Sequence, residues 1–312
     1  MDRSSARGAV GLVIALTTAL FTPACHCTHP VREGSEPRTT VAAAEPTEPE
    51  NDAERALAVP ESARGMWVWG TKRRLDAPDG ASSLLDTIRL AELTEVYVSL
   101  SQDVLDDPRL PPLLDAIAAR GVRIEALTGE ATWSRRDKLP AVLAVVDAVA
   151  AYNAGHTTRF AGLHFDIEPH QLPENRNNHA FVPALAATLR AARERAAKVG
   201  LTVSADLPRF ALEEHGPLFA EAVQRPFVML YELRDRSPEA LARQSRRVLD
   251  NTYRGVSPTL RGRLVVGVRM EDYPSNVDEV VHALDSAHIG DVRYGGSAVH
   301  DEAKYRAAST DR

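Results

Sequence analysis

The chain has 312 residues, of which 37 are Lys or Arg and 43 are Asp or Glu, so its formal net charge is −6. Hydrophobic residues make up 44% and charged residues 26%, an ordinary globular composition that excludes a wholly disordered or fibrous chain. The mild acidity argues against nucleic acid as the main partner, because nucleic-acid-binding domains are usually basic.

Residues 1–24 have the pattern of an export signal. Two arginines precede an apolar run over residues 10–21, which is shorter than the roughly 20 residues of a membrane-spanning helix. Residues 22–25 (TPAC) are similar to a bacterial lipoprotein cleavage box, in which the cysteine becomes the lipidated first residue, so we expect a lipid anchor on Cys25. Plain signal cleavage and secretion is the alternative. Either way the sequence predicts an exported protein of the cell envelope or its surroundings.

Residues 25–63 are expected to form a flexible linker. The segment is rich in Glu, Pro, Thr and Ala and has no lasting apolar period. Such a composition buries too little apolar surface to offset the entropy lost on ordering. We therefore expect the globular domain over residues 64–312.

Strand-like and helix-like runs alternate throughout the expected globular domain. The eight expected strands cover residues 66–69, 95–100, 122–127, 162–168, 201–206, 227–231, 264–268 and 292–299. Helices are expected over residues 82–93, 112–120, 138–152, 180–200 and 211–223, from 237–238 onward, and around 277–284. Eight strands in roughly 250 residues predict a single (β/α)8 TIM barrel, an α/β fold. A doubly wound open sheet is the alternative, but no Gly-rich phosphate loop follows any strand.

The fourth expected strand, GLHFDIE, carries the clearest chemical signal. Polar and apolar residues alternate, so His164, Asp166 and Glu168 share one face. In TIM barrels the chemistry lies at the carboxyl ends of the strands. Two carboxylates roughly 6–7 Å apart disfavour each other's ionisation, and burial raises a pKa further, which suits a general acid. A structural network with arginines is the alternative.

The phrase FDIE, preceded by Gly162, resembles the fourth-strand signature of family 18 glycoside hydrolases, the chitinase-like barrels. In that family, acidic residues at alternate positions end in the catalytic glutamate. The resemblance implies that Glu168 is the proton donor and that Asp166 orients the acetamido group of the substrate. His164 stands where the family normally has another aspartate.

Other strands agree with the resemblance in part. The sequence MLYE at residues 229–232 is similar to the sixth-strand Met-x-Tyr-Asp motif, which implies that Tyr231 holds the acetamido group. The third-strand Ser-x-Gly-Gly motif is replaced by LTGE at residues 127–130, and the eighth-strand tryptophan is replaced by AVH at residues 298–300. The pattern therefore indicates a distant relative of the family.

The resemblance implies substrate-assisted glycoside hydrolysis, in which the acetamido oxygen of the sugar attacks and no cofactor is needed. A sugar without an acetamido group would require a second carboxylate, for which the candidates at other strand ends are Asp206, Glu232 and Glu271. Trp67 and Trp69 could stack on a sugar, although a first-strand tryptophan is as often part of the core. The expected substrate-contacting residues are Trp67, Trp69, His164, Asp206, Glu232, Glu271 and His300.

Two other functions are kept as alternatives. The pattern H-x-D-x-E-x-H from His164 to His170, with residues 300–302, has the ligand types of a metal-dependent hydrolase using His164, Asp166 and Glu168. Ligands along one strand lie too far apart to share one ion, so we expect no metal. A lipoprotein that binds envelope glycan without cleaving it is the second alternative.

The expected partner is a carbohydrate or cell-wall glycan, bound by a monomer. Two arginine-rich stretches, residues 190–198 and 234–247, are interpreted as solvated helix faces.

Overall fold

The structure, a computed structural model, describes residues 62–176, 178–257 and 262–310. The expected signal segment, Cys25 and almost all of the expected linker lie outside the described residues. Among those described, no helix combines the length and apolar character that a membrane crossing requires.

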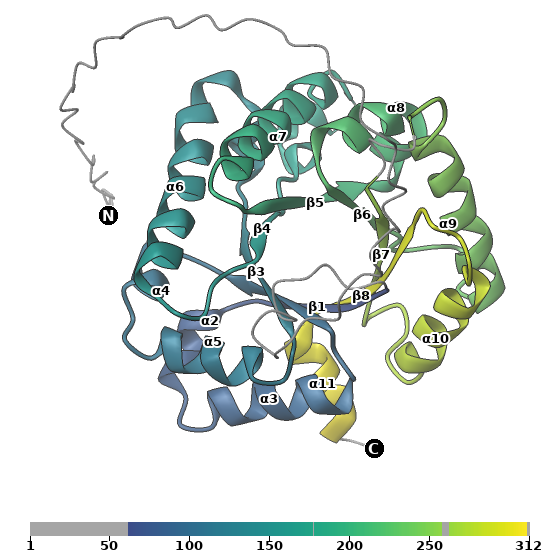
Figure 1. The fold of residues 1–312 in the computed structure, drawn as a ribbon. Coiled ribbons are helices and arrows are strands. Elements are labelled where there is room, and N and C mark those ends of the chain that lie inside the picture. Colours follow the sequence, from purple (N-terminus) through teal and green to yellow (C-terminus); the bar gives the residue numbers. More distant parts are fainter. Residues whose placement is uncertain (1–61, 177, 258–261, 311–312) are drawn as a thin grey trace, which may run out of the picture. The chain divides into compact units, whose positions relative to one another are not determined.

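Eight parallel strands close into a barrel in chain order, and helices surround it (Figure 1). The predicted TIM barrel is confirmed. The strands are β1 Ala63–Val68, β2 Glu95–Ser99, β3 Arg123–Thr128, β4 Gly162–Phe165, β5 Thr202–Pro208, β6 Arg225–Met229, β7 Leu264–Arg269 and β8 Tyr294–His300.

The helices include those expected, in the same order, and three that the sequence did not predict, at residues 71–76, 102–105 and 302–310. They are α2 Thr71–Asp76, α3 Gly80–Leu90, α4 Gln102–Leu105, α5 Leu110–Ala118, α6 Leu139–Gly155, α7 Val182–Ala197, α8 Arg209–Ala222, α9 Pro238–Thr252, α10 Val277–Ala287 and α11 Glu302–Thr310. Ser237 caps α9 by accepting a hydrogen bond from the Ala240 N–H at 3.2 Å, and Pro238 occupies the first helical position. Short 3-10 turns η1 Ala131–Ser134, η2 Arg136–Lys138, η3 Pro169–Gln171 and η4 Pro173–Asn175 complete the loops after β3 and β4.

The end of β4 differs from the prediction. The ladder with β3 stops at Phe165, so Asp166 and Glu168 lie just beyond the strand rather than within it. Asp166 still donates its backbone N–H to the Thr128 carbonyl at 2.9 Å, after which the chain turns into η3 at Pro169. The alternation of polar and apolar residues persists past the last ladder pair, which is why the sequence pattern overextends the strand.

The outward faces of the strands form the main hydrophobic core with the helices. Leu163, Phe165 and Ile167 are all buried in this layer, as their alternation predicts. The apolar filling inside the barrel is much smaller, namely Ala63, Trp67, Tyr97, Leu127, Phe227, Val265 and Ala298. The rest of the barrel interior therefore has to be filled by polar side chains.

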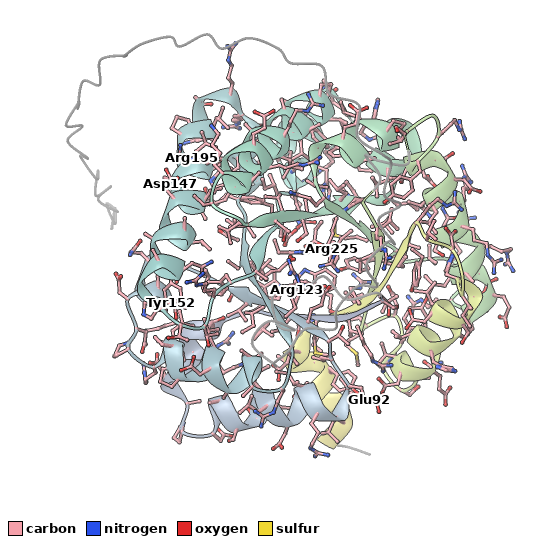
Figure 2. All side chains as sticks on the ribbon, viewed as in Figure 1. Glu92, Arg123, Asp147, Tyr152, Arg195 and Arg225 are labelled. Atoms are coloured by element: carbon pink, nitrogen blue, oxygen red, sulfur yellow. The ribbon has the colours of Figure 1, made fainter. Side chains whose placement is uncertain are left out.

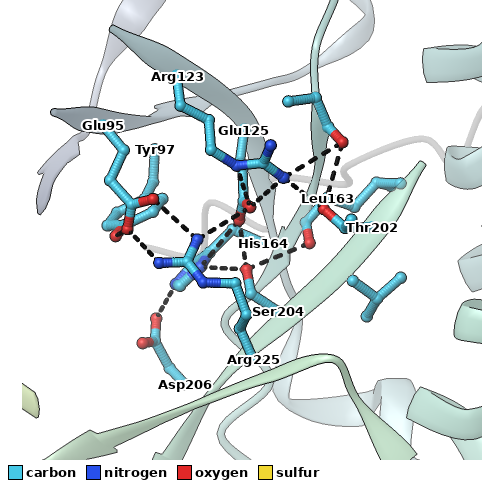
Figure 3. Close-up of polar contacts among 12 residues, drawn as sticks. Glu95, Tyr97, Arg123, Glu125, Leu163, His164, Thr202, Ser204, Asp206 and Arg225 are labelled. Atoms are coloured by element: carbon cyan, nitrogen blue, oxygen red, sulfur yellow. Dashed lines mark hydrogen bonds and ion pairs between the residues drawn. The ribbon is translucent and has the colours of Figure 1, made fainter. Parts of the chain in front are cut away.

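The amino-terminal half of the interior holds a network of buried charges (Figure 3), which we call the basal charge network: Glu95, Arg123, Glu125 and Arg225. Arg225 donates to both oxygens of Glu95 at 2.7 and 2.8 Å and to Glu125 at 3.3 Å. Arg123 donates to Glu125 at 3.1 and 3.2 Å. Figure 2 shows Arg123 and Arg225 at the centre of the barrel. Each charge in this network has a buried partner of opposite sign.

Candidate active site

His164 connects the basal charge network to the carboxyl-terminal half of the barrel. It lies on β4, is fully buried, and places Nδ1 2.7 Å from Ser204 Oγ and Nε2 2.9 Å from Asp206 Oδ2. Ser204 in turn donates to Glu125. Burial opposes a charged ring, but the carboxylates of Asp206 and Glu125 outweigh it and raise the pKa of His164 to about 9. At neutral pH His164 is therefore a buried cation.

Trp67 orients the other side of Asp206. Its Nε1 lies 2.9 Å from Asp206 Oδ2 and 3.1 Å from His164 Nε2. A protonated Nε2 has no lone pair to offer, so the indole N–H donates to Asp206. Asp206 is thus held by two donors on one oxygen.

The expected stacking role of Trp67 does not fit this position. Its side chain is only 1% exposed, with the rings of Tyr97, Phe227 and His300 5.3–6.0 Å away, so no face is open to a sugar. The inward position on β1 at mid-barrel makes it part of the core. Trp69, two residues closer to the mouth, is half-buried and donates to His300 Nε2 at 3.1 Å.

Asp166 is the first residue after β4, and its backbone packs against the loop that follows β3. A Cβ at Gly129 would overlap the carbonyl oxygen of Asp166, so only glycine permits this approach. The Oδ1 atom is buried and has no hydrogen-bond partner. Burial, followed by the charges of Asp206 and Glu168, raises the pKa of Asp166 to about 8.

Glu168 is more accessible than Asp166, with 24% of its side chain exposed. Its Oε1 lies 3.5 Å from His170 Nε2, and Oε2 accepts a hydrogen bond from Gln171. Burial first, and the charge of Asp206 second, raise the pKa of Glu168 to about 7. A substantial fraction of this carboxyl group is therefore protonated near neutral pH.

Asp206 and Tyr231 complete the set of titratable side chains that includes Asp166 and Glu168. In the β4–β5 ladder Phe165 pairs with Ala205, so Asp166, the first residue after β4, lies beside Asp206, which is still within β5. Burial and then the charges of Asp206, Asp166 and Glu168 raise the pKa of Tyr231 well above its ordinary value. We refer to Asp166, Glu168, Asp206 and Tyr231 as the mouth cluster.

Two other expected carboxylates do not join the mouth cluster. The side chain of Glu232 is 73% exposed and pairs with Arg269 at 3.2 Å. Glu271 is 44% exposed and forms ion pairs with Lys304 and, at 3.8 Å, with Arg269. Of the three candidate second carboxylates, the structure brings only Asp206 to the cluster.

Arg269 is a residue that the sequence reasoning missed. It is the last residue of β7, and its guanidinium lies 5.7 Å from the centre of the Tyr231 ring. A search for polar residues at the end of every strand, not only the acidic ones, would have found it.

Unsatisfied buried atoms gather at this edge of the barrel. Nine buried side-chain polar atoms in the described ranges have no hydrogen-bond partner. Five of them lie at the carboxyl-terminal edge: Asp166 Oδ1, His170 Nδ1, Asp206 Oδ1, Arg269 Nε and His300 Nδ1. Because buried polar atoms are normally paired, this concentration indicates a place built to contact a polar ligand.

The residues of the metal-hydrolase alternative do not assemble. Within residues 62–176, 178–257 and 262–310, no three His, Cys, Asp or Glu side chains are arranged to hold a metal ion. Both ring nitrogens of His164 are engaged by Ser204 and Asp206. Glu302 is turned away into a buried pair with Arg74.

Comparison with known proteins gives likenesses of fold. No family description and no curated protein sequence matches the chain. A chitinase from Chromobacterium violaceum aligns with 80% of this chain and 98% of its own at 13% identity and a TM-score of 0.50. A family 18 glycoside hydrolase chitinase from Pseudoalteromonas aurantia aligns with 80% and 100% at 11% identity and a TM-score of 0.51.

A third similar structure is a family 5 glycoside hydrolase from Streptomyces cattleya, solved in complex with Manβ1-4GlcNAc. It aligns with 76% of this chain and 70% of its own at 14% identity and a TM-score of 0.53. The expected resemblance to family 18 glycoside hydrolases is therefore confirmed as a likeness of fold: the chain has the (β/α)8 barrel that these solved glycoside hydrolases also have.

Proposed function

We propose that this protein is a glycoside hydrolase that cleaves glycosidic bonds in an oligo- or polysaccharide, with Glu168 as the general acid. The observation that carries the proposal is the position of Glu168, two residues beyond Asp166 and in the same cluster as Asp206 and Tyr231. A pKa raised to about 7 keeps the acid form available at neutral pH while leaving a usable base after the proton is given up.

The first step breaks the bond between C1 of the sugar and the leaving oxygen. Glu168 gives its proton to the leaving oxygen, which also takes the bonding electron pair. The acetamido oxygen of the sugar forms the new bond to C1, so no protein nucleophile is required. Asp166 orients the acetamido group, and the hydroxyl of Tyr231 donates a hydrogen bond to it.

The second step returns the enzyme to its starting state. Water attacks C1, the Glu168 carboxylate takes a proton from that water, and the bond from C1 to the acetamido oxygen breaks. The product is a free sugar end, and Glu168 is again protonated. For a sugar that lacks the acetamido group, Asp206 is the second carboxylate, because Trp67 and His164 already hold its other oxygen.

Features of similar structures support an acetamido sugar as the substrate. The proteins from Chromobacterium violaceum and Pseudoalteromonas aurantia are chitinases, and the one from Streptomyces cattleya was solved with a disaccharide that contains N-acetylglucosamine. The partner of this chain is accordingly proposed to be a glycan that contains N-acetylated sugar, such as a cell-wall glycan.

The test is hydrolysis of aryl N-acetylglucosaminides, chitooligosaccharides and cell-wall glycan strands by the full chain. Glu168→Gln should lower turnover by about 10²–10⁴-fold, the usual contribution of a general acid. Glu174→Gln is the matched control, because Glu174 lies on the same loop but is exposed and paired with Arg135. Retained turnover in Glu168→Gln rejects the assigned acid.

Two other outcomes identify the alternatives. Turnover that is lost with a chelator supports a metal-dependent hydrolase. Glycan that is retained on an affinity column but never cleaved supports a binding lipoprotein.

We further propose that the chain is exported, attached to a bacterial membrane by a lipid on Cys25, and active as a monomer. The supporting feature is the order of a basic start, a short apolar run and the TPAC box. Mass spectrometry of the amino-terminal peptide should detect a lipid that Cys25→Ala removes and Cys27→Ala retains. An unmodified cysteine in the membrane fraction contradicts the anchor.

A further inference from the structure

A pocket lined by arginines lies between the start of α8, the loop after β6 and one face of α9, with a volume of about 570 Å³. Four guanidiniums line it, and we call it the arginine pocket: Arg209, Arg234, Arg243 and Arg247. The sequence predicts a solvated helix face over residues 234–247, and the structure groups three arginines of this stretch with Arg209 of α8 around one pocket.

The position of the pocket follows from the barrel. Arg209 begins α8 immediately after the last residue of β5, and Arg234 lies in the loop that follows β6 and Tyr231. Arg243 and Arg247 are four residues apart and so share one face of α9. The pocket is therefore built at the same carboxyl-terminal edge, by the loops and helices that follow the strands of Asp206 and Tyr231.

The guanidiniums of the pocket have unused hydrogen-bonding capacity. None of the four donates a hydrogen bond to any of the described residues. The ion pairs that they form are long: Arg209 lies 4.0 Å from Glu213, Arg247 3.6 Å from Glu213, and Arg243 3.6 Å from Asp235. By contrast, Arg195 on α7 donates two hydrogen bonds of 2.7 and 2.9 Å to Asp147.

The carboxylates around the pocket leave an excess of positive charge. Glu213 is shared between two arginines and also accepts from Gln244 at 2.6 Å. Asp235 accepts the backbone N–H of Ser237 at 2.9 Å. Glu232 pairs with Arg269, which does not line the pocket. Among the described residues, no carboxylate lies within ion-pair distance of Arg234.

We propose that the arginine pocket binds an anionic substituent, a carboxylate or a phosphate, on the glycan that reaches the mouth cluster. Planar guanidiniums bind such groups through paired hydrogen bonds. The mouth cluster itself contains no cationic side chain that could pair with an anion, so the acidic unit of the glycan is directed to the arginine pocket. The inference rests on the proposed function for the placement of the scissile unit, and it makes an acidic glycan the preferred substrate.

The test measures binding rather than cleavage, with the full chain carrying Glu168→Gln so that the glycan stays intact. Calorimetry compares chitotetraose with a tetrasaccharide of alternating N-acetylglucosamine and N-acetylmuramic acid, whose lactyl carboxylates are the added feature. The acidic glycan should bind about tenfold tighter, the effect of a charge-assisted hydrogen bond, and the preference should weaken as salt is added. A carboxyl-reduced form of the same tetrasaccharide should lose the preference.

Arginine variants assign the preference to the pocket. Arg234→Gln with Arg243→Gln and Arg247→Gln should bring the ratio of the two affinities close to one. The matched control removes three exposed arginines elsewhere on the barrel: Arg89→Gln, Arg120→Gln and Arg159→Gln. Competition by inorganic phosphate or by free glucuronate then distinguishes a phosphate ligand from a carboxylate ligand.

The outcomes separate this inference from the proposed function. Equal affinity for the neutral and acidic glycans, or the same loss in the control triple variant, overturns the pocket assignment. If the wild-type chain cleaves nothing while the acidic preference remains and depends on the pocket, the arginine pocket stands and the proposed function fails.

Discussion

The basal charge network and the mouth cluster lie in the same barrel interior and differ in how their carboxylates are satisfied. In the basal network each carboxylate oxygen of Glu95 and Glu125 accepts a hydrogen bond. In the mouth cluster, Oδ1 of Asp166 and Oδ1 of Asp206 accept none. Arginines face the first group, whereas in the second Asp206 pairs with His164 and, among the described residues, no Lys or Arg pairs with Asp166 or Glu168.

This difference separates a structural use of buried charge from a chemical one. Burial raises the pKa of a carboxyl group unless a cation compensates for it. For Glu125, burial alone would raise the pKa, but His164, Arg123 and Arg225 hold it well below its usual range. Asp166 lacks such a partner, and its pKa rises to about 8. Paired carboxylates stay ionised and hold the barrel together, and unpaired ones retain protons that they can transfer.

The largest effect is expected from removing a cation of the basal network. Arg225→Met leaves Glu95 buried without a cation and removes one of the two guanidiniums that pair with Glu125, which should lower the free energy of unfolding by about 3–5 kcal/mol. Arg195→Met is the control: Arg195 makes an equally well-formed pair with Asp147, but on the outside of the barrel (Figure 2), where pairs contribute about 0–1 kcal/mol. Equal losses in urea unfolding would contradict the structural role of the network.

The strands of the barrel could be predicted from the sequence better than the side-chain pairs that fill its interior. Apolar runs separated by helical stretches located all eight strands, because each strand buries its outer face against helices. The basal network was missed because Glu95, Arg123 and Arg225 stand at the starts of strands, where a charged residue looks like a solvent-exposed flank. Their pairing joins positions up to 130 residues apart, which no local spacing encodes.

The acidic residues of the mouth cluster were easier to predict from the sequence than the side chains that surround them. Asp166, Glu168 and Tyr231 belong to short patterns at strand ends, so the topology alone brings them to one edge. The burial of Trp67 was not predictable, because it depends on how the opposite strands fill the interior. The long ion pairs of the arginine pocket depend on the packing of α8 against α9, which sequence periodicity does not define.

Alanine substitutions at two glycines, one beside the mouth cluster and one beside the basal charge network, test whether the two regions have different roles. A Cβ at Gly129 would overlap the carbonyl of Asp166, and a Cβ at Gly65 would overlap the hydroxyl of Tyr97, which donates to Glu95. Each alanine substitution should destabilise the barrel by about 1–3 kcal/mol, as overpacking does. Gly129→Ala should also lower turnover per folded molecule, whereas Gly65→Ala should not. Loss of turnover in both variants would mean that the two halves of the interior are mechanically coupled.

The pH dependence of stability should differ between the two regions. Asp166 and Glu168 have folded-state pKa values of about 8 and 7, above their ordinary values of 3.8 and 4.5. The folded state therefore holds more protons than the unfolded state, and stability falls as pH rises from about 4 to 8, by up to about 1.4 kcal/mol per pH unit for each proton. Glu125 has the opposite sign: its contribution is present above its ordinary value of 4.5 and is lost as pH falls below it.

Asp166→Asn separates the fall in stability above pH 4 from the loss of stability at lower pH. The variant should remove the part of the decline between pH 4 and pH 8 that Asp166 causes, keep the part that Glu168 causes, and leave the loss of stability below pH 4 unchanged, as urea unfolding across this pH range measures. Stability curves that run parallel for wild type and variant would show that Asp166 does not retain its proton in the folded state.

The smallest effect is expected at Glu271, which lies at a strand end but outside the mouth cluster. Its exposed pair with Lys304 should contribute less than about 1 kcal/mol, and Glu271→Gln should leave the pH–rate profile in place. Asp206→Asn is the informative partner, because the charge of Asp206 helps to raise the pKa of Glu168. Removing that charge lowers the pKa of the general acid, so the alkaline limb of the profile moves to lower pH. A shift of the same size in Glu271→Gln would show that distance from the cluster does not protect the acid, and that the division between paired and unpaired carboxylates is wrong.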